Sequence, residues 1–329
     1  LAKTRWTSWR ADSKLKDFYR THGISIAIPM RVESQEVAIL VLGNKLSGDI
    51  YFEQDLRLLE IFSSEAGIKY FIFGAFSTAV TLYGISLIYG LCGTLDLALF
   101  HQLTEIATVQ QPIFIFALML VLVGFGFKCS IVPFHMWTPD VYQGAPTPVA
   151  AFFSVAPKAM GFVLILRVFV ESLGGHFFQW PVIATAIAIT TMTVGNVMAL
   201  SQHNIKRLFA YSTIAQAGYI LAGLAIATPS GVKATLFYIV VYGFMNLGAF
   251  ACVLAAKNTI TNDKLESYSG LYQRVPFLAV SFMICLLSLA GVPPLAGFLA
   301  KFFIITAAVE AKSMGLAFAI IANSVLALY

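Results

Sequence analysis

The sequence predicts an all-α polytopic membrane bundle of about eight transmembrane helices, two of them broken, preceded by a short soluble α+β segment. Hydrophobic residues make up 59% of the chain and charged residues only 11%, whereas a soluble domain carries about 25% charged residues. The mean hydropathy is +0.82. Apolar runs of membrane length recur from residue 69 onward, and prolines interrupt two of them.

The charge distribution changes near residue 65. Residues 1–65 hold 9 basic and 9 acidic residues, whereas residues 66–329 hold 12 basic and 7 acidic residues. We therefore predict a partial soluble segment at 1–64 and a membrane domain at 65–329. The four cysteines lie in apolar stretches without paired spacing, which indicates packing residues and neither a disulfide framework nor a metal site; they are Cys92, Cys129, Cys252 and Cys285.

The first 64 residues contain signals for strands and a helix. Two runs rich in Ile and Val between Gly23 and Gly43, joined by RVESQE, predict a β-hairpin. An acidic first turn at Glu53 and Asp55, followed by leucines at helical spacing, predicts a helix over 53–62. This segment resembles the C-terminal half of a GAF domain, a small-molecule sensor module. Because half of that sheet would leave an unpaired edge, we expect no working ligand site there.

Eight stretches are candidates for membrane crossings, at roughly 20 apolar residues each. Pro133 interrupts the Lys128 segment two residues after the second stretch, and Pro293 and Pro294 lie within the seventh. Non-helical backbone at membrane depth persists only where it is buried in protein or lines a hydrated cavity. The stretches are 69–91, 112–131, 149–170, 181–201, 208–227, 233–256, 276–310 and 315–329.

Basic residues are concentrated in every second connection between these stretches. Because loops rich in lysine and arginine stay in the cytoplasm, these connections should face it. We therefore expect a multi-pass protein of a bacterial-type inner membrane, with residues 1–64 on the cytoplasmic side. The residues that set this orientation are Lys206, Arg207, Lys257, Lys264 and Arg274.

Lys128, Lys158 and Lys301 lie inside the apolar stretches. A charge near the bilayer centre costs at least ~2.5–3.5 kcal/mol on insertion scales, so these lysines imply water, counter-charges or a proton path between the helices. A low dielectric disfavours a charged ammonium and a nearby carboxylate or water favours it, so the protonation can be switched. We therefore predict that three buried lysines form a proton relay. The alternative for each is a lysine whose ammonium reaches the membrane interface.

Polar residues near the lysines are candidates to hold water between them, although an interhelical hydrogen bond is the expected role of each taken singly. His135 follows Pro133 and should lie at a loop mouth, where a structural or gating role is as suitable as proton transfer. The other supporting candidates are Ser130, Tyr142, Ser154, Tyr211, Ser212, Thr213, Gln216 and Tyr238.

Four strings in the membrane part resemble the antiporter-like subunit N of respiratory complex I, the proton-pumping NADH:quinone oxidoreductase. They are EAGIKYFIFGAFSTA, GFGFKCSIVPFHMWTPDVYQGAPTPVAAFFSVAPKAMGF, NIKRLFAYSTIAQAGYIL and AGVPPLAGFLAKFF. The resemblance runs from about Glu65 to Tyr329. It implies a family of fourteen helices with two inverted five-helix repeats, each holding a broken helix, of which this chain would supply the sixth to the thirteenth.

The resemblance also implies separate roles for the lysines. Lys128 would be the central lysine of the first broken helix, Lys158 the connecting lysine on the next helix, and Lys301 the lysine nearest the outlet. In the family, a glutamate on the fifth helix pairs with the central lysine, and that helix is absent from this sequence. Gln216 occupies a position where related chains often carry histidine.

The implied function is that of a non-redox translocase subunit, which moves protons through the lysines while partner subunits reduce quinone. No cofactor is expected in this chain, and NADH, FMN, iron–sulfur clusters and quinone would belong to partner subunits. The expected partners are other membrane subunits of complex I and the lipid bilayer, with no nucleic acid.

Three alternatives remain open at this point. The chain could be a subunit of a multi-subunit sodium/proton antiporter, or a membrane-anchored GAF sensor. It could also be a truncated or chimeric chain that cannot pump by itself, since the string SSEAGIKYF fits both the end of a GAF helix and the start of the membrane part.

Overall fold

In a computed structural model of the chain, the structure describes residues 26–32, 35–42, 65–99, 112–174, 179–260 and 262–328. The chain divides into two compact units, residues 1–71 and 72–329. In the first unit, strands β1 (Ile26–Val32) and β2 (Gln35–Leu42) form an antiparallel pair. The predicted hairpin is therefore confirmed. The helix predicted over 53–62 lies outside the described residues.

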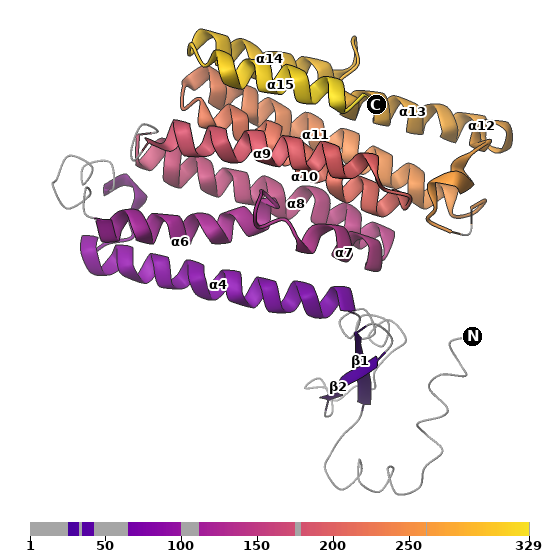
Figure 1. Cartoon of the computed structure of the whole chain (residues 1–329), viewed down its shortest axis with the longest axis horizontal. Coiled ribbons are helices and arrows are strands. Elements are labelled where there is room, and N and C mark those ends of the chain that lie inside the picture. Colours follow the sequence, from indigo (N-terminus) through magenta and orange to yellow (C-terminus); the bar gives the residue numbers. More distant parts are fainter. Residues whose placement is uncertain are drawn as a thin grey trace, which may run out of the picture. The chain divides into compact units, whose positions relative to one another are not determined.

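The described part of the second unit is helical, and Figure 1 shows its long helices running side by side. All eight stretches predicted to cross the membrane form helix, whereas the short helix α7 was not predicted. The helices are α4 (Glu65–Cys92, which begins in the first unit), α6 (Pro112–Cys129), α7 (Trp137–Gly144), α8 (Thr147–Ile165), α9 (Trp180–Leu200), α10 (Ile205–Ala225), α11 (Pro229–Ala256), α12 (Leu271–Arg274), α13 (Pro276–Ala290), α14 (Ala296–Glu310) and α15 (Met314–Leu326). A π-helical segment, Leu166–Ser172, continues α8.

Six of the described helices are long and apolar enough to cross a membrane: α4, α6, α8 with its π-helical continuation, α9, α10 and α11. The seventh predicted crossing is divided into α13 and α14, of 15 residues each, and α15 has 13 residues. The chain is therefore a multi-pass membrane protein, and the total of eight crossings stays a prediction.

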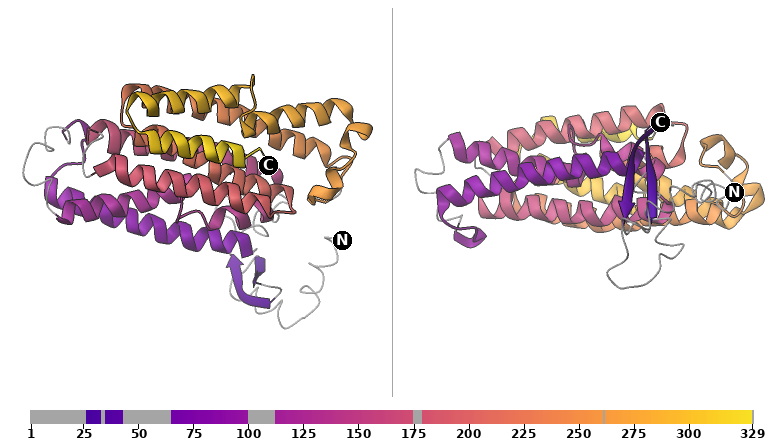
Figure 2. Two further views of the ribbon diagram at one scale, coloured as in Figure 1. Left: turned by 45° about the horizontal axis from the view of Figure 1, so that its top comes forward. Right: turned by 90° about the horizontal axis from the view of Figure 1, so that it is seen from below.

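Helix α10 lies in the interior of the second unit, as Figures 1 and 2 show, and packs against α7, α8, α9, α11 and α14. Glycines let it approach α9 closely: a Cβ atom added at Gly195 would lie 2.4 Å from the backbone nitrogen of Ala215. A Cβ atom at Gly218 would lie 2.6 Å from the backbone nitrogen of Met192. Small residues at such a crossing increase van der Waals contact between membrane helices, which have little hydrophobic drive to associate.

The first helix break separates α6 from α7 at Pro133, as predicted. Helix α6 ends at Cys129, and the backbone N–H of Val132 donates a hydrogen bond to Thr191 Oγ1 on α9, at 3.1 Å. The indole Nε1 of Trp137 donates to the carbonyl oxygen of Phe127, at 3.0 Å. The break therefore finds hydrogen-bond partners within the protein, as irregular backbone at membrane depth requires.

The second break separates α13 from α14 at Pro293 and Pro294, also as predicted. Helix α13 ends at Ala290 and is followed by Gly291, whose φ of 92° lies in the region that favours glycine. The backbone N–H of Gly297 donates to Ser288 Oγ, at 3.2 Å. This contact ties the first turn of α14 back to the last turn of α13.

Candidate functional site

Lys158 is buried at the first helix break, with 2% of its surface exposed. Its Nζ donates hydrogen bonds to Ser130 Oγ, at 2.5 Å, and to the carbonyl oxygen of Cys129, at 3.4 Å. Ser130 Oγ also accepts a hydrogen bond from Thr138 Oγ1, at 2.7 Å. Nζ lies 5.7 Å from the centre of the Trp137 ring, within cation–π range. The ammonium therefore meets a hydroxyl, a carbonyl and an aromatic face.

Lys301 is buried at the second break, with 3% of its surface exposed. Its Nζ donates to the carbonyl oxygen of Ala290, at 2.7 Å, and lies 4.5 Å from the centre of the Tyr219 ring. Its stem crosses Gly291, where an added Cβ atom would lie 2.9 Å from Lys301 Cδ. Glycine at 291 therefore serves both the turn and the position of this lysine.

Both ammonium groups lie at the carboxyl end of a half-helix, because Cys129 is the last residue of α6 and Ala290 is the last residue of α13. The terminal carbonyls there carry partial negative charge, which stabilises a nearby cation by ~0.3–1 kcal/mol when exposed and up to ~2 kcal/mol when partly buried. None of the ion pairs among the described residues includes Lys158 or Lys301. Within the described chain, helix dipoles therefore take the place of carboxylate partners.

A series of buried polar groups begins next to Lys158. Ser154 lies one helical turn before Lys158, and its Oγ accepts a hydrogen bond from Asn246 Nδ2, at 2.5 Å. The Ser154 carbonyl oxygen accepts one from the Tyr242 hydroxyl, at 2.9 Å. Asn246 Oδ1 is buried and has no hydrogen-bond partner among the described residues. A buried acceptor of this kind is a suitable partner for an internal water molecule.

The series continues to Lys301 through α11, α10 and α13. Tyr238, one turn before Tyr242, donates a hydrogen bond to Gln216 Oε1, at 2.5 Å. Gln216 Nε2 donates to the carbonyl oxygen of Leu289, at 3.0 Å. The next carbonyl along the chain, that of Ala290, accepts from Lys301. Five helices, namely α8, α11, α10, α13 and α14, thus contribute polar groups to one row between the two lysines.

The expectation that Lys128 is buried is wrong for the described part of this chain, because Lys128 is exposed. Its neighbour Cys129 is fully buried and its Sγ lies 4.0 Å from the carbonyl oxygen of Lys158. Successive residues of a helix point about 100° apart, so the packing of α8 against Cys129 leaves the Lys128 side chain outside. The part of Lys128 in a relay stays a prediction.

The other candidates divide into those in the row and those outside it. Gln216 lies in the row, with 3% of its surface exposed, whereas His135 is half-buried in the turn before α7. His135 Nδ1 is buried without a hydrogen-bond partner among the described residues. Tyr211 is buried and Ser212 half-buried in the first half of α10, and Pro133, Pro293 and Pro294 lie exposed at the breaks.

Sequence reasoning missed the aromatic partners Trp137 and Tyr219 and the amide of Asn246. The two aromatic residues could not be distinguished from packing residues in a sequence that is rich in aromatic side chains. Asn246 carried a usable signal, because a carboxamide inside a membrane-length stretch seeks a polar partner.

Comparison with known families gives a match over most of the chain. A family model described as NADH:quinone oxidoreductase/Mrp antiporter, TM, matches residues 57–327. NADH-quinone oxidoreductase subunit N of Desulforamulus reducens is 46% identical over 255 residues, which cover 77% of this chain and 53% of that protein. Subunit N of Trichlorobacter lovleyi is 42% identical over 308 residues, which cover 93% of this chain and 63% of that protein.

A solved structure of the same kind of complex is also similar to this chain. A chain of respiratory complex I from Thermus thermophilus with bound aureothin aligns with a TM-score of 0.67 and 38% identity, covering 80% of this chain and 56% of that chain. The chain spans about half the length of several of the proteins it matches. The 93% coverage reaches into residues 1–64, so at least part of that segment aligns with a subunit N, and the GAF resemblance stays a prediction.

Proposed function

Because this chain belongs to the family of NADH:quinone oxidoreductase and Mrp antiporter transmembrane subunits, we propose that it is a proton-translocating membrane subunit of an NADH:quinone oxidoreductase. It moves protons through buried lysines while partner subunits carry out the redox chemistry with NADH, FMN, iron–sulfur clusters and quinone. The observation that carries the proposal is the row of buried polar groups between Lys158 and Lys301.

The contacts of Lys158 suit both of its protonation states. A charged ammonium donates to Ser130 Oγ and to the Cys129 carbonyl. After the proton leaves, the neutral amine accepts a hydrogen bond from the Ser130 hydroxyl, since a serine hydroxyl both donates and accepts. With neutral partners only, no fixed negative charge within the described chain holds the proton in place. The site therefore stores a proton and can release it.

Transfer from Lys158 toward Lys301 follows the polar row. The row contains two hydrogen-bonded groups, one around Ser154 and Asn246 and the other around Tyr238 and Gln216. One helical turn separates Lys158 from the first group and the first group from the second. A proton needs water to cross each of these two gaps. Asn246 Oδ1, which lacks a partner among the described residues, supports a water molecule at the first such step. Lys301 at the second break is the last lysine of the row.

Lys128 fits the proposal as the lysine that receives its partner from outside the described residues. An exposed ammonium on a membrane-embedded helix requires a counter-charge or water. The family resemblance gives that counter-charge as a glutamate on a preceding helix. We therefore include Lys128 in the relay on the condition that such a carboxylate faces it in the assembled complex.

The assembly and orientation follow from the same assignment. The chain would pack with other membrane subunits of the complex in a bacterial-type inner membrane, with its basic connections and residues 1–64 in the cytoplasm. Residues 65–329 form the translocating domain, with an inverted-repeat relation between the two broken helices, and residues 1–64 form a GAF-like soluble segment. A sodium/proton antiporter subunit is the second candidate, because the family description covers both kinds of complex.

The test is proton translocation in vesicles that contain the complete complex. Lys158→Met and Lys301→Met should each lower the number of protons moved per NADH oxidised, whereas Lys233→Met, an exposed lysine at the start of α11, should not. Undiminished translocation in either of the first two variants removes that lysine from the relay. Proton flux that depends on sodium would favour the antiporter instead.

A further inference from the structure

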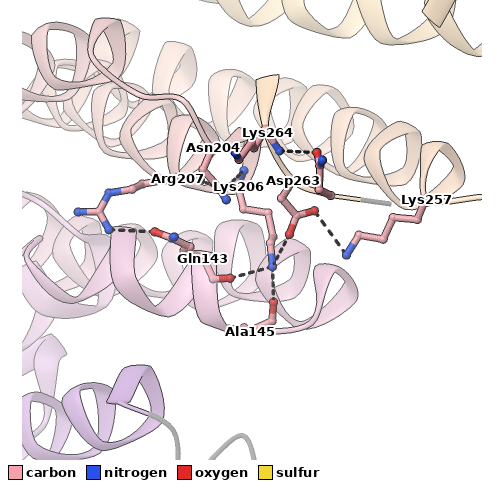
Figure 3. Close-up of polar contacts among 9 residues, drawn as sticks. Gln143, Ala145, Asn204, Lys206, Arg207, Lys257, Asp263 and Lys264 are labelled. Atoms are coloured by element: carbon pink, nitrogen blue, oxygen red, sulfur yellow. Dashed lines mark hydrogen bonds and ion pairs between the residues drawn. The ribbon is translucent and has the colours of Figure 1, made fainter. Parts of the chain in front are cut away.

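Lys206, at the start of α10, is nearly buried, with 7% of its side chain exposed. Figure 3 shows its Nζ among three oxygen atoms: the carbonyl oxygens of Gln143, at 2.8 Å, and Ala145, at 3.1 Å, and Asp263 Oδ2, at 3.1 Å. The Asn204 side chain caps this turn by accepting hydrogen bonds from the Lys206 and Arg207 backbone N–H groups. The position of Lys206 at the start of α10 is thereby fixed.

The two carbonyl groups belong to the carboxyl end of α7, where a cation is stabilised by unpaired carbonyls and the helix dipole. Arg207 also binds α7, through side chains of that helix: its guanidinium donates to Asp140 Oδ1, at 2.8 Å, and to Gln143 Oε1, at 3.1 Å. Helix α7 has only 8 residues, far below the ~12–15 residues at which isolated helices become even marginally stable. Its position therefore depends on contacts such as these.

The opposite end of α7 forms part of the Lys158 site. Thr138 Oγ1 donates to Ser130 Oγ, which in turn accepts from Lys158 Nζ, and the Trp137 ring faces the same ammonium. We infer that Lys206 is a positioning residue for Lys158: it holds the carboxyl end of α7 so that Thr138 and Trp137 stay in place at the other end. The importance of this role for proton transfer depends on the proposed function, whereas the contact itself does not.

The same lysine also ties α7 to the connection that follows α11. The Asp263 carboxylate also forms a longer ion pair with Lys257, at 3.7 Å. The backbone carbonyl oxygen of Asp263 accepts a hydrogen bond from the backbone N–H of Ile205, at 2.8 Å. Lys257 keeps 40% of its side chain exposed, so its pair with Asp263 is largely solvated and contributes little. Lys257 therefore provides a matched control: a lysine on the same carboxylate whose ion pair among the described residues is with Asp263 and not with α7.

The first readout is hydrogen–deuterium exchange of the α7 amides in the assembled complex, which requires no activity. In Lys206→Met, exchange over residues 137–144 should be at least about tenfold faster, a factor that corresponds to ~1.4 kcal/mol. Lys206→Arg, which keeps the cation, and Lys257→Met should exchange close to the wild-type rate. Unchanged exchange in Lys206→Met overturns the inference.

The second readout is proton translocation by the same variants. Lys206→Met should lower it and Lys206→Arg should restore most of it. Faster exchange with full translocation would show that α7 does not position Lys158 for transfer, and would overturn the inference. If Lys158→Met also translocates normally, the proposed function itself fails. If Lys206→Met is not recovered in the membrane, Lys206→Gln decides by the same measurements, because its shorter, neutral side chain cannot hold both α7 carbonyls: unchanged exchange overturns the inference.

Discussion

Replacing Gln216 with leucine is the sharpest way to interrupt the polar row without touching a lysine. The Gln216 amide joins the Tyr238 hydroxyl, which donates to Oε1, to the carbonyl oxygen of Leu289, which accepts from Nε2. Leucine occupies a similar volume but can neither donate nor accept. The substitution therefore removes the hydrogen-bonded connection between α11 and the second helix break, and it leaves the charges of the chain unchanged.

The magnitude follows from the two groups that lose their partner. A buried polar group without a hydrogen bond costs about 1–3 kcal/mol, and both the Tyr238 hydroxyl and the Leu289 carbonyl become such groups. If one of these costs is added to the barrier for transfer, the rate falls by about 5- to 150-fold, at 1.36 kcal/mol per factor of ten. Histidine at this position can both accept and donate, so Gln216→His should retain most of the flux.

The assay is the initial rate of proton translocation by the complete complex in vesicles, measured with a pH-sensitive dye. Gln273→Leu, at an exposed glutamine of α12, is the matched control and should behave as wild type. Normal translocation in Gln216→Leu, with the variant present in the complex at wild-type amount, would refute the view that protons pass along this row.

Two further predictions concern the helix breaks. Gly291→Ala places a Cβ atom 2.9 Å from Lys301 Cδ at a φ of 92°, and an alanine in the left-handed region costs roughly 1–2 kcal/mol before any displacement of the lysine; translocation should fall, and wild-type flux would contradict the assigned packing. Thr191→Val removes the acceptor for the Val132 N–H, which costs about 1–3 kcal/mol and should lower Tm by roughly 2–12 °C in a thermal-shift measurement; an unchanged Tm would contradict this role of Thr191.

The positions of the helix breaks could be predicted because proline leaves a clear signal. A proline cannot continue the hydrogen bonds of a helix, so Pro133 and the pair Pro293–Pro294 marked both interruptions. The burial of Lys158 and Lys301 could be predicted from their positions inside apolar stretches of the sequence. Each of these expectations depends on local chemistry that a single stretch of sequence contains.

The side of a helix that faces its neighbours could not be predicted here. Helix α6 is apolar on every side, so no amphipathic pattern distinguishes Lys128 from the adjacent Cys129, and only the packing of α8 makes one exposed and the other buried. The role of Lys206 was missed for a related reason. As a basic residue in a connection it indicated orientation, and its contacts with α7 arise only from the tertiary fold.

The most direct test of the central claim combines the two lysines in one double-mutant experiment. Proton translocation by the complete complex is measured for Lys158→Met, Lys301→Met and the double variant. If both lysines belong to one route, each single change should reduce translocation. The double variant should then translocate as much as the single variant with the lower translocation, because interruption of a route at two points is no worse than at one. Reductions that multiply in the double variant, or an unaffected single variant, would contradict a single route through Lys158 and Lys301.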